Sequence, residues 1–162
     1  MSKPLIRKIY TDDPLIKYTT TTIPPDRTKH EIDGVLAEYE VKDVYWHWDL
    51  EHNNVYVMFK IEEIVAGLPV LASARVDCPT IWDKAKPRGH PPKPEQVNWM
   101  VSLRAMHHFI YTHLNAAYAM QSSKTVAFLG YIQNVDGKQL KELIIPRLSE
   151  YRALEVKEEV KK

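Results

Sequence analysis

The stretch VYWHWDLEHNNVYVMFKI, residues 44–61, decides the fold, because apolar and polar residues alternate on both sides of a turn. In its first half, Trp46, Trp48 and Leu50 share one face, which is the pattern of a half-buried strand. The segment EHNN is typical of a turn, since Asn tolerates positive φ. The second half again has apolar residues at every other position: Val55, Val57, Phe59 and Ile61. The stretch therefore predicts two antiparallel strands.

The segments on either side extend this hairpin. VLASARV, residues 70–76, predicts a third strand that ends near Cys78 and Pro79, and the short connections favour an antiparallel meander. PPDRTKHEIDGVLAEYEV, residues 24–41, has apolar residues at helical spacing after Asp26, a residue suited to an N-cap. This segment predicts a helix over about residues 26–39.

The second half of the chain predicts three more helices. KPEQVNWMVSLRAMHHFIYTHLNAAYAM, residues 93–120, carries a long apolar stripe, and Pro94 suits a first turn, so we expect a helix of about 27 residues there. SSKTVAFLGYI predicts a cap and a short helix, NVDGK a turn, and QLKELIIPRLSEY an amphipathic segment that Pro146 interrupts. The expected order is α-β-β-β-α-α-α, an α+β fold in which helices pack a three-stranded antiparallel meander in two layers.

The length of 162 residues predicts a single domain over 1–162, with an extended, Thr-rich arm over 1–24 and a charged segment over 152–162. The 22 basic and 21 acidic residues nearly balance, so any binding of a polyanion must be local. The single cysteine, Cys78, cannot form an internal disulfide and favours a reducing compartment. We find no secretory signal or apolar span, and we therefore expect a cytoplasmic protein without a membrane segment.

Several of these segments together resemble a family of uncharacterised proteins encoded in phages, prophages and other mobile elements of bacteria and archaea. The resemblance covers about residues 18–148 and is carried mainly by SLRAMHHFIYTHLNAAYAM, then VAFLGYI, then DGKQLKELIIPRL. The Leu36-to-Tyr39 unit and the Cys78-Pro79 step also match. The resemblance implies a viral or mobile-element origin and a shared fold, but it implies no activity.

The segment WDKAKPRGHPPKP, residues 82–94, is the strongest candidate for a binding site. Lysine and arginine side chains on a loop neutralise phosphates and release counterions, and prolines lower the cost of ordering the loop. Trp82 is suited to stacking on a base. We therefore predict sequence-independent binding of nucleic acid through a basic, Pro-rich loop. The contacting residues would be Trp82, Lys84, Lys86, Arg88, Lys93 and Arg104.

Catalytic chemistry finds little support. The helix-strand-strand-strand-helix order is also that of restriction-endonuclease-like folds, in which Asp49 and Glu62 would hold a divalent ion, but Lys60 precedes Glu62 instead of following it. His107, His108 and His113 lack the separation of four that pairs of zinc ligands on a helix need. No Gly-rich phosphate loop or nucleophile motif is present. We expect no enzyme activity, cofactor or metal; a metal-dependent nuclease is the weaker alternative.

A second class of function uses a protein partner. Exposed tyrosines suit interfaces, since each combines a large contact area with a polar tip. The candidates are Tyr111, Tyr118, Tyr131 and Tyr151. The alternative hypothesis is therefore an adaptor, an inhibitor of a host factor, or a homo-oligomer.

Overall fold

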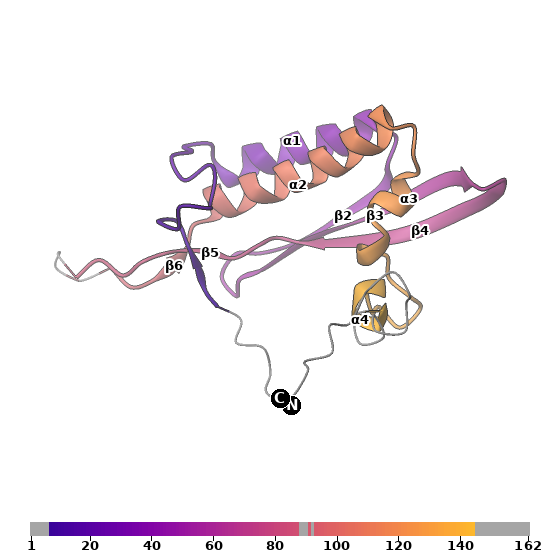
Figure 1. Ribbon diagram of the computed structural model, residues 1–162. Helices are drawn as coiled ribbons and strands as arrows, with labels where there is room; N and C mark the ends of the chain where they lie inside the picture. The colour runs from indigo at the N-terminus through magenta and orange to yellow at the C-terminus, as the bar shows by residue number, and fades with distance from the viewer. Residues whose placement is uncertain (1–6, 88–90, 92, 145–162) are drawn as a thin grey trace, which may run out of the picture.

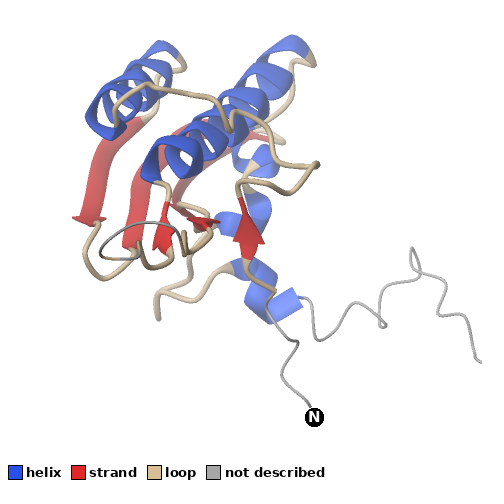
Figure 2. Ribbon diagram, turned by 90° about the vertical axis from the view of Figure 1, so that its left-hand side faces the viewer, coloured by secondary structure: helices blue, strands red, loops and turns tan. Residues whose placement is uncertain are grey.

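The computed structural model describes residues 7–87, 91 and 93–144, and it shows an α+β fold in two layers (Figure 1). One layer is a three-stranded sheet of β2 (Lys42–Asp49), β3 (Asn54–Val65) and β4 (Leu68–Asp77). Helices α1 (Pro25–Glu38) and α2 (Trp99–Ala119) form the other layer. Figure 2 shows both helices on the same side of these strands. The predicted α+β class and the meander are confirmed.

The alternation of apolar and polar residues in the sequence corresponds to a sheet that packs one face against the core. Asp49 pairs with Asn54 across the predicted turn, where Asn53 has a φ of 53°. The register of β2 slips between Lys42 and Tyr45, which is a β-bulge. The inner face of β3 is buried and consists of Val55, Val57, Phe59 and Ile61. The opposite face carries charges that pair with one another: Lys42 with Glu62, Lys60 with Asp43, and Arg75 with Asp77.

Helices α1 and α2 lie side by side and run in the same direction (Figure 1). Arg104 of α2 meets Glu31 in the middle of α1, and Asn115 meets Tyr39 at the end of α1. In the described part of the chain, no helix is long and apolar enough to cross a membrane.

A helix carries partial positive charge at its N-terminus and partial negative charge at its C-terminus. Parallel packing therefore places two partial positive charges together at one end of the helix layer and two partial negative charges at the other.

A second, small sheet lies at the N-terminal end of α2. It consists of β1 (Ile9–Tyr10), β5 (Ile81–Asp83) and β6 (Gln96–Val97) in the order β1-β5-β6, with β1 parallel and β6 antiparallel to β5. The sequence did not predict these strands. The expected helix start at Pro94 is wrong, because Gln96 and Val97 pair with β5. Asn98 is the N-cap, and its side chain accepts a hydrogen bond from the backbone N–H of Val101.

The chain after α2 follows the predicted course. Ser123 caps α3 (Lys124–Ala127), the 3₁₀ helix η1 (Leu129–Tyr131) follows, and Asn134 organises the turn before α4 (Leu140–Ile144). Pro146 lies outside the described residues. At α1 the expected cap is wrong: Pro24 is the N-cap and Asp26 lies in the first turn, where a carboxylate complements the helix dipole.

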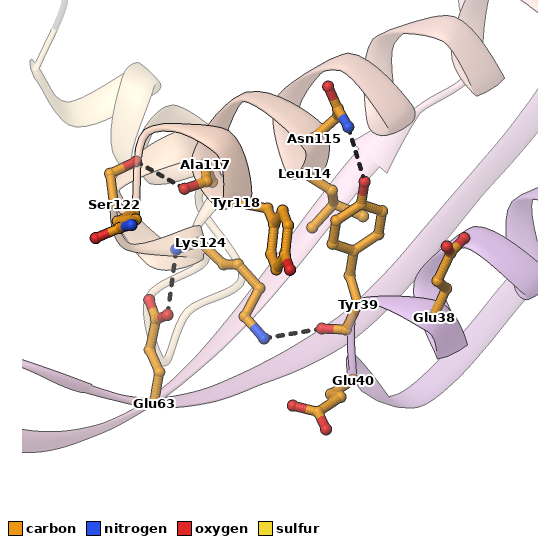
Figure 3. Close-up of a pocket in the computed structure, with 11 residues that line it drawn as sticks. Glu38, Tyr39, Glu40, Glu63, Leu114, Asn115, Ala117, Tyr118, Ser122 and Lys124 are labelled. Atoms are coloured by element: carbon orange, nitrogen blue, oxygen red, sulfur yellow. Dashed lines mark hydrogen bonds between the residues drawn. The ribbon is translucent and has the colours of Figure 1, made fainter.

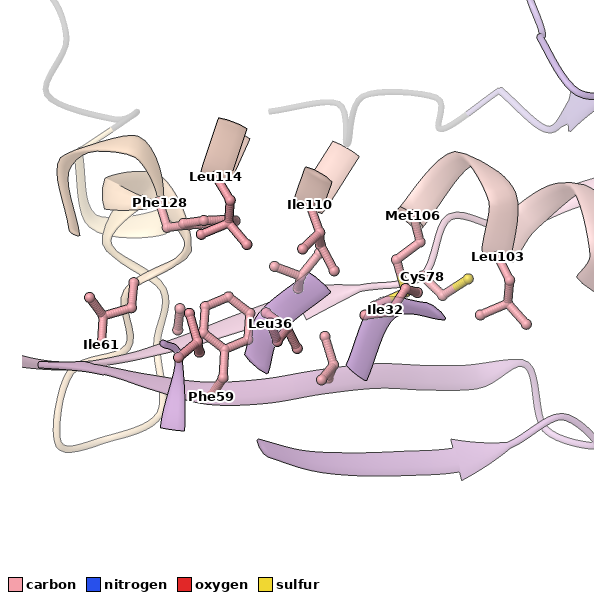
Figure 4. Packing of buried hydrophobic residues seen from close by; sticks show 14 of the residues in the cluster. Ile32, Leu36, Phe59, Ile61, Cys78, Leu103, Met106, Ile110, Leu114 and Phe128 are labelled. Carbon is pink, nitrogen blue, oxygen red and sulfur yellow. The ribbon is translucent and has the colours of Figure 1, made fainter. Parts of the chain in front are cut away.

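The core lies between the two helices and the inner face of the sheet (Figure 4). The rings of Phe59 and Phe128 meet edge to face, with centroids 5.3 Å apart. Phe128 is fully buried and also contacts Phe109 of α2. The helical contribution is a stripe of Ile32, Leu36, Leu103, Met106, Ile110 and Leu114. Phe128 thereby joins the segment after α2 to the sheet.

Replacing Phe128 with Ala tests this joint. The change leaves a cavity beside Phe59, and we expect the free energy of unfolding to fall by about 3–5 kcal/mol. Val135→Ala, at a fully exposed position of the same segment, is the control and should change it by less than about 0.5 kcal/mol. Urea denaturation followed by circular dichroism measures both. Equal effects would show that Phe128 is not part of the core.

Candidate functional site

The described part of the predicted basic segment forms a two-stranded structure, here called the finger (residues 81–87 and 93–97), which extends outward from the N-terminal end of α2 (Figure 1). Further out than β5 and β6, Lys86 and Lys93 form a bridge, with the N–H of Lys86 donating to the carbonyl of Lys93 at 3.0 Å. Both lysines are exposed, and no ion pair among the described residues includes either one. Arg88 lies outside the described residues.

Hydrogen bonds fix the base of the finger to α2. The buried hydroxyl of Ser102 accepts from the N–H of Ile81 at 3.0 Å, and the N–H of Asn98 donates to the carbonyl of Ile81 at 2.8 Å. The side-chain amide of Asn98 also donates to Asp83 at 3.2 Å. The finger therefore has a defined direction relative to the helix.

The N-terminal segment engages two of the predicted contact residues. Lys84 pairs with Asp12 at 2.6 Å, and this hydrogen bond raises the pKa of Lys84. Trp82 is half-buried, with the ammonium of Lys8 4.3 Å from its ring centroid. Lys8 itself pairs with Glu95 at 2.9 Å. Trp82 and Lys84 thus make internal contacts that the sequence did not indicate.

Arg104 lies away from the finger loop, in the seam between α1 and α2. Its side chain is 11% exposed and forms an ion pair with Glu31. Burial acts to raise the pKa of Glu31, but Arg104 outweighs it and the pKa is lowered. Burial and the charge of Arg104 lower the pKa of His107. The structure gives Arg104 a contact in the helix packing, and among the described residues of the finger Lys86 and Lys93 remain as exposed cations without an ion pair.

A pocket that the sequence did not reveal lies at the opposite end of the helices (Figure 3). It has a volume of about 670 Å³ between the C-terminal ends of α1 and α2 and the strand β3. Tyr39 and Tyr118 meet edge to face at 6.1 Å, and Tyr118 is 75% exposed. The residues that line it are Glu38, Tyr39, Glu40, Glu63, Leu114, Asn115, Ala117, Tyr118, Gln121, Ser122 and Lys124.

Both helices end at this pocket in the same way. The N–H of Val41 donates to the carbonyl of Leu36 at 2.9 Å, and the N–H of Ser122 donates to that of Ala117 at 2.8 Å. These are Schellman motifs, in which a left-handed residue, commonly Gly, follows the helix. Here Glu40 and Gln121 take that place, with φ of 59° and 51°. Two polar side chains are thereby positioned at the pocket where glycine would be favoured.

Lys124 and Glu63 form the floor of the pocket. The ammonium of Lys124 donates to the carbonyl of Tyr39 at 2.8 Å, which satisfies one carbonyl at the end of α1. Glu63 accepts from the hydroxyl of Ser123 and from the N–H of Thr125 at 2.6 Å. Burial acts to raise the pKa of Glu63, but these hydrogen bonds outweigh it and the pKa is lowered. Glu63 therefore stabilises the N-terminal end of α3, whereas the side chains of Glu38 and Glu40 are exposed at the pocket.

The residues of the nuclease alternative do not meet. Asp49 is bound to His52 at the β2–β3 turn, whereas Glu62 pairs with Lys42 and Lys60 with Asp43 towards the far end of β3. Asp49 faces Asn54, so eight residues of strand, about 26 Å, separate it from Glu62. Among the described residues no cluster of histidine, cysteine and carboxylate side chains is suited to a metal ion. The arrangement for two-carboxylate metal chemistry is absent at these positions.

The other histidines and tyrosines that the sequence singled out do not form one cluster but have separate environments. His108 bonds to the hydroxyl of Tyr18 at 2.9 Å, and His113 bonds to the carbonyl of Phe109 at 2.8 Å. Tyr131 packs against the core, so its predicted exposure is wrong. Tyr111 and Tyr118 are exposed as expected, and Tyr151 lies outside the described residues.

Comparison with known proteins found no match: no family model matches the chain, and no curated protein or solved structure matches it significantly. The resemblance to proteins of phages and mobile elements stays a prediction. The sequence did not predict the pocket, because the two tyrosines of its wall are far apart in the chain. The one local signal that could have indicated it is a polar residue, Glu40 or Gln121, directly after each helix.

Glu63→Gln tests the floor of the pocket. The lowered pKa of Glu63 in the folded protein means that its carboxylate contributes stability above the ordinary pKa, and this contribution is lost as pH falls through the folded-state value. We expect the variant to lose about 1 kcal/mol at neutral pH and to approach the wild type in acid. Glu62→Gln, on the exposed face of the same strand, is the control. An identical pH dependence in all three proteins would contradict this role.

Glu40→Gly tests whether the pocket retains a strained residue. Glycine adopts positive φ without steric cost, so we expect the free energy of unfolding to rise by about 0.5–1 kcal/mol. The melting temperature by differential scanning calorimetry measures the gain, with Gly137→Ala as the reverse control, since Gly137 has a φ of 75°. A destabilised Glu40→Gly protein would show that Glu40 makes a compensating contact in the folded state.

Proposed function

We propose that the protein is a non-enzymatic binding module that contacts nucleic acid through the finger, independently of base sequence. The principal contacts are Lys86 and Lys93. Lys84 lies at the same end, but its charge is paired with Asp12, as that of Lys8 is with Glu95. We further propose a cytoplasmic location, on the ground that the only cysteine, Cys78, is a buried free thiol.

The observation on which the proposal rests is the β-bridge that places Lys86 and Lys93 opposite each other. Like charges directly opposite each other on neighbouring strands are destabilising unless an anion lies between or beside them. Other cross-strand cations of the described fold are neutralised, as Lys42 is by Glu62 and Lys60 by Asp43. The two finger lysines lack such an acid within the described residues. A row of phosphates would supply the missing negative charge.

The packing of the two helices adds partial positive charge at the same end of the molecule. α1 and α2 both begin near the finger, so their N-terminal partial positive charges add to that of the lysines. Trp82 is half-buried beside Lys8, and the proposal therefore rests on phosphate contact rather than on base stacking. Contacts of this kind do not distinguish bases, and their strength falls as the salt concentration rises.

The double variant Lys86→Ser/Lys93→Ser tests the proposal. We expect its affinity for a labelled oligonucleotide to fall about tenfold at low salt, because two phosphate contacts are lost. The slope of log affinity against log salt should become shallower by about 2. Fluorescence anisotropy with single- and double-stranded oligonucleotides measures both quantities.

The matched control is Lys42→Ser/Lys60→Ser, which removes the same charge from positions already paired with acids. It should bind oligonucleotide with less than about a twofold change. Equal losses in the two double variants would mean that net charge, and not the finger, determines binding. Absence of binding by the wild type at low salt would contradict the proposed function and favour a protein partner.

A further inference from the structure

The pocket has the chemistry of a site for a basic side chain. Glu38 and Glu40 are exposed at its rim, and no ion pair among the described residues includes either carboxylate. The C-terminal ends of α1 and α2 add partial negative charge from two helix dipoles. Lys124 neutralises only part of this, since it is one cation in a lining that has three carboxylates, those of Glu38, Glu40 and Glu63. The lining of the pocket therefore carries net negative charge.

The aromatic wall points to the same class of ligand. Tyr118 leaves three quarters of its surface exposed although it packs edge to face on Tyr39. A lysine or arginine cation is attracted to an aromatic face, and more strongly where carboxylates lie nearby. A volume of about 670 Å³ is within the size range of known binding pockets, so one or two long basic side chains fit it.

We propose that the pocket receives the finger of a second copy of this chain, with Lys86 or Lys93 against Tyr118 and close to Glu38 and Glu40. The complementarity is present in one molecule but cannot be satisfied within it. The finger begins at the N-terminal end of α2 and the pocket lies at its C-terminal end, about 30 Å away along 21 residues of helix. Contact between the two surfaces must therefore join different copies.

A contact between two different surfaces is head-to-tail, so it leaves one finger and one pocket unused in each dimer and allows further copies to add. Because the contact is small and mainly electrostatic, it should weaken as salt rises. The same lysines serve the proposed nucleic-acid contact, and an oligonucleotide should consequently compete with self-association. The residues of the pocket, however, take no part in the proposed nucleic-acid contact.

Two complementary variants test the proposal by sedimentation velocity of the full chain. Glu38→Lys/Glu40→Lys removes the pocket and keeps the finger, whereas Lys86→Ser/Lys93→Ser removes the finger and keeps the pocket. We expect the wild type to form species larger than a dimer at about 0.05 M salt and to dissociate at about 0.5 M. Each variant alone should stay a monomer, and their equimolar mixture should stop at a one-to-one dimer.

The control Glu51→Lys/Glu142→Lys carries the same charge change as the pocket variant, at exposed positions outside the pocket, and should assemble like the wild type. Tyr118→Ala is a second pocket variant without a charge change, and it should weaken association at least threefold. A dimer in the mixture also shows that both partners are folded. A monomeric wild type, a monomeric mixture, or assembly by the pocket variant would overturn the proposal.

The two proposals can fail separately. The pocket variant retains Lys86 and Lys93, so its affinity for an oligonucleotide should be at least that of the wild type. If oligonucleotide binding is absent while the mixture forms dimers, the proposed function is wrong and the inference stands. If oligonucleotide binding depends on the finger while no protein assembles, only the inference is overturned.

Discussion

The packing of α2 on the inner face of β3 is the contact on which the rest of the structure depends. Alternate residues of the strand and every third or fourth residue of the helix form one core, in which Phe59 and Ile110 are buried. This contact fixes the direction of α2, and α2 in turn carries the base of the finger at one end and the pocket at the other. The separation of the two candidate surfaces is thus a consequence of core packing.

Parallel packing of α1 on α2 gives these ends opposite electrostatic character. The helix N-termini lie near the exposed Lys86 and Lys93, and the C-termini lie near Glu38 and Glu40. A chain whose basic and acidic residues nearly balance can therefore still present a local surface for an anion and another for a cation. The sheet contributes little to this polarity, because charges on its outer face pair across strands.

The sequence predicted what depends on local periodicity and missed what depends on distant partners. Strands β2, β3 and β4 follow from alternation around Phe59, and the cap at Ser123 follows from residue type. Strand β6 was lost to a predicted helix, since the two residues Gln96 and Val97 are strand only because β5 lies beside them.

The same limit applies to the candidate site. Lys86 and Lys93 are exposed, but they face each other in a two-stranded finger and not in the expected loop. Arg104 was nominated by its charge, and only the structure reveals Glu31 beside it. Trp82 is likewise suited to stacking by residue type, but the ammonium of Lys8 lies near its ring. The pocket depends on Tyr39 and Tyr118 meeting across two helices, and no local pattern indicates that contact.

The central claim is that the finger is where the molecule meets a polyanion. The most direct test is a titration of the ¹⁵N-labelled protein with a short oligonucleotide, followed by amide chemical shifts in two-dimensional NMR spectra. We predict that the largest shifts fall on the amides of residues 84–86, 93, 95 and 96, with smaller ones at the N-terminal ends of α1 and α2. Shifts concentrated on the outer face of β2–β4 or around Tyr118, with the finger unchanged, would contradict the account.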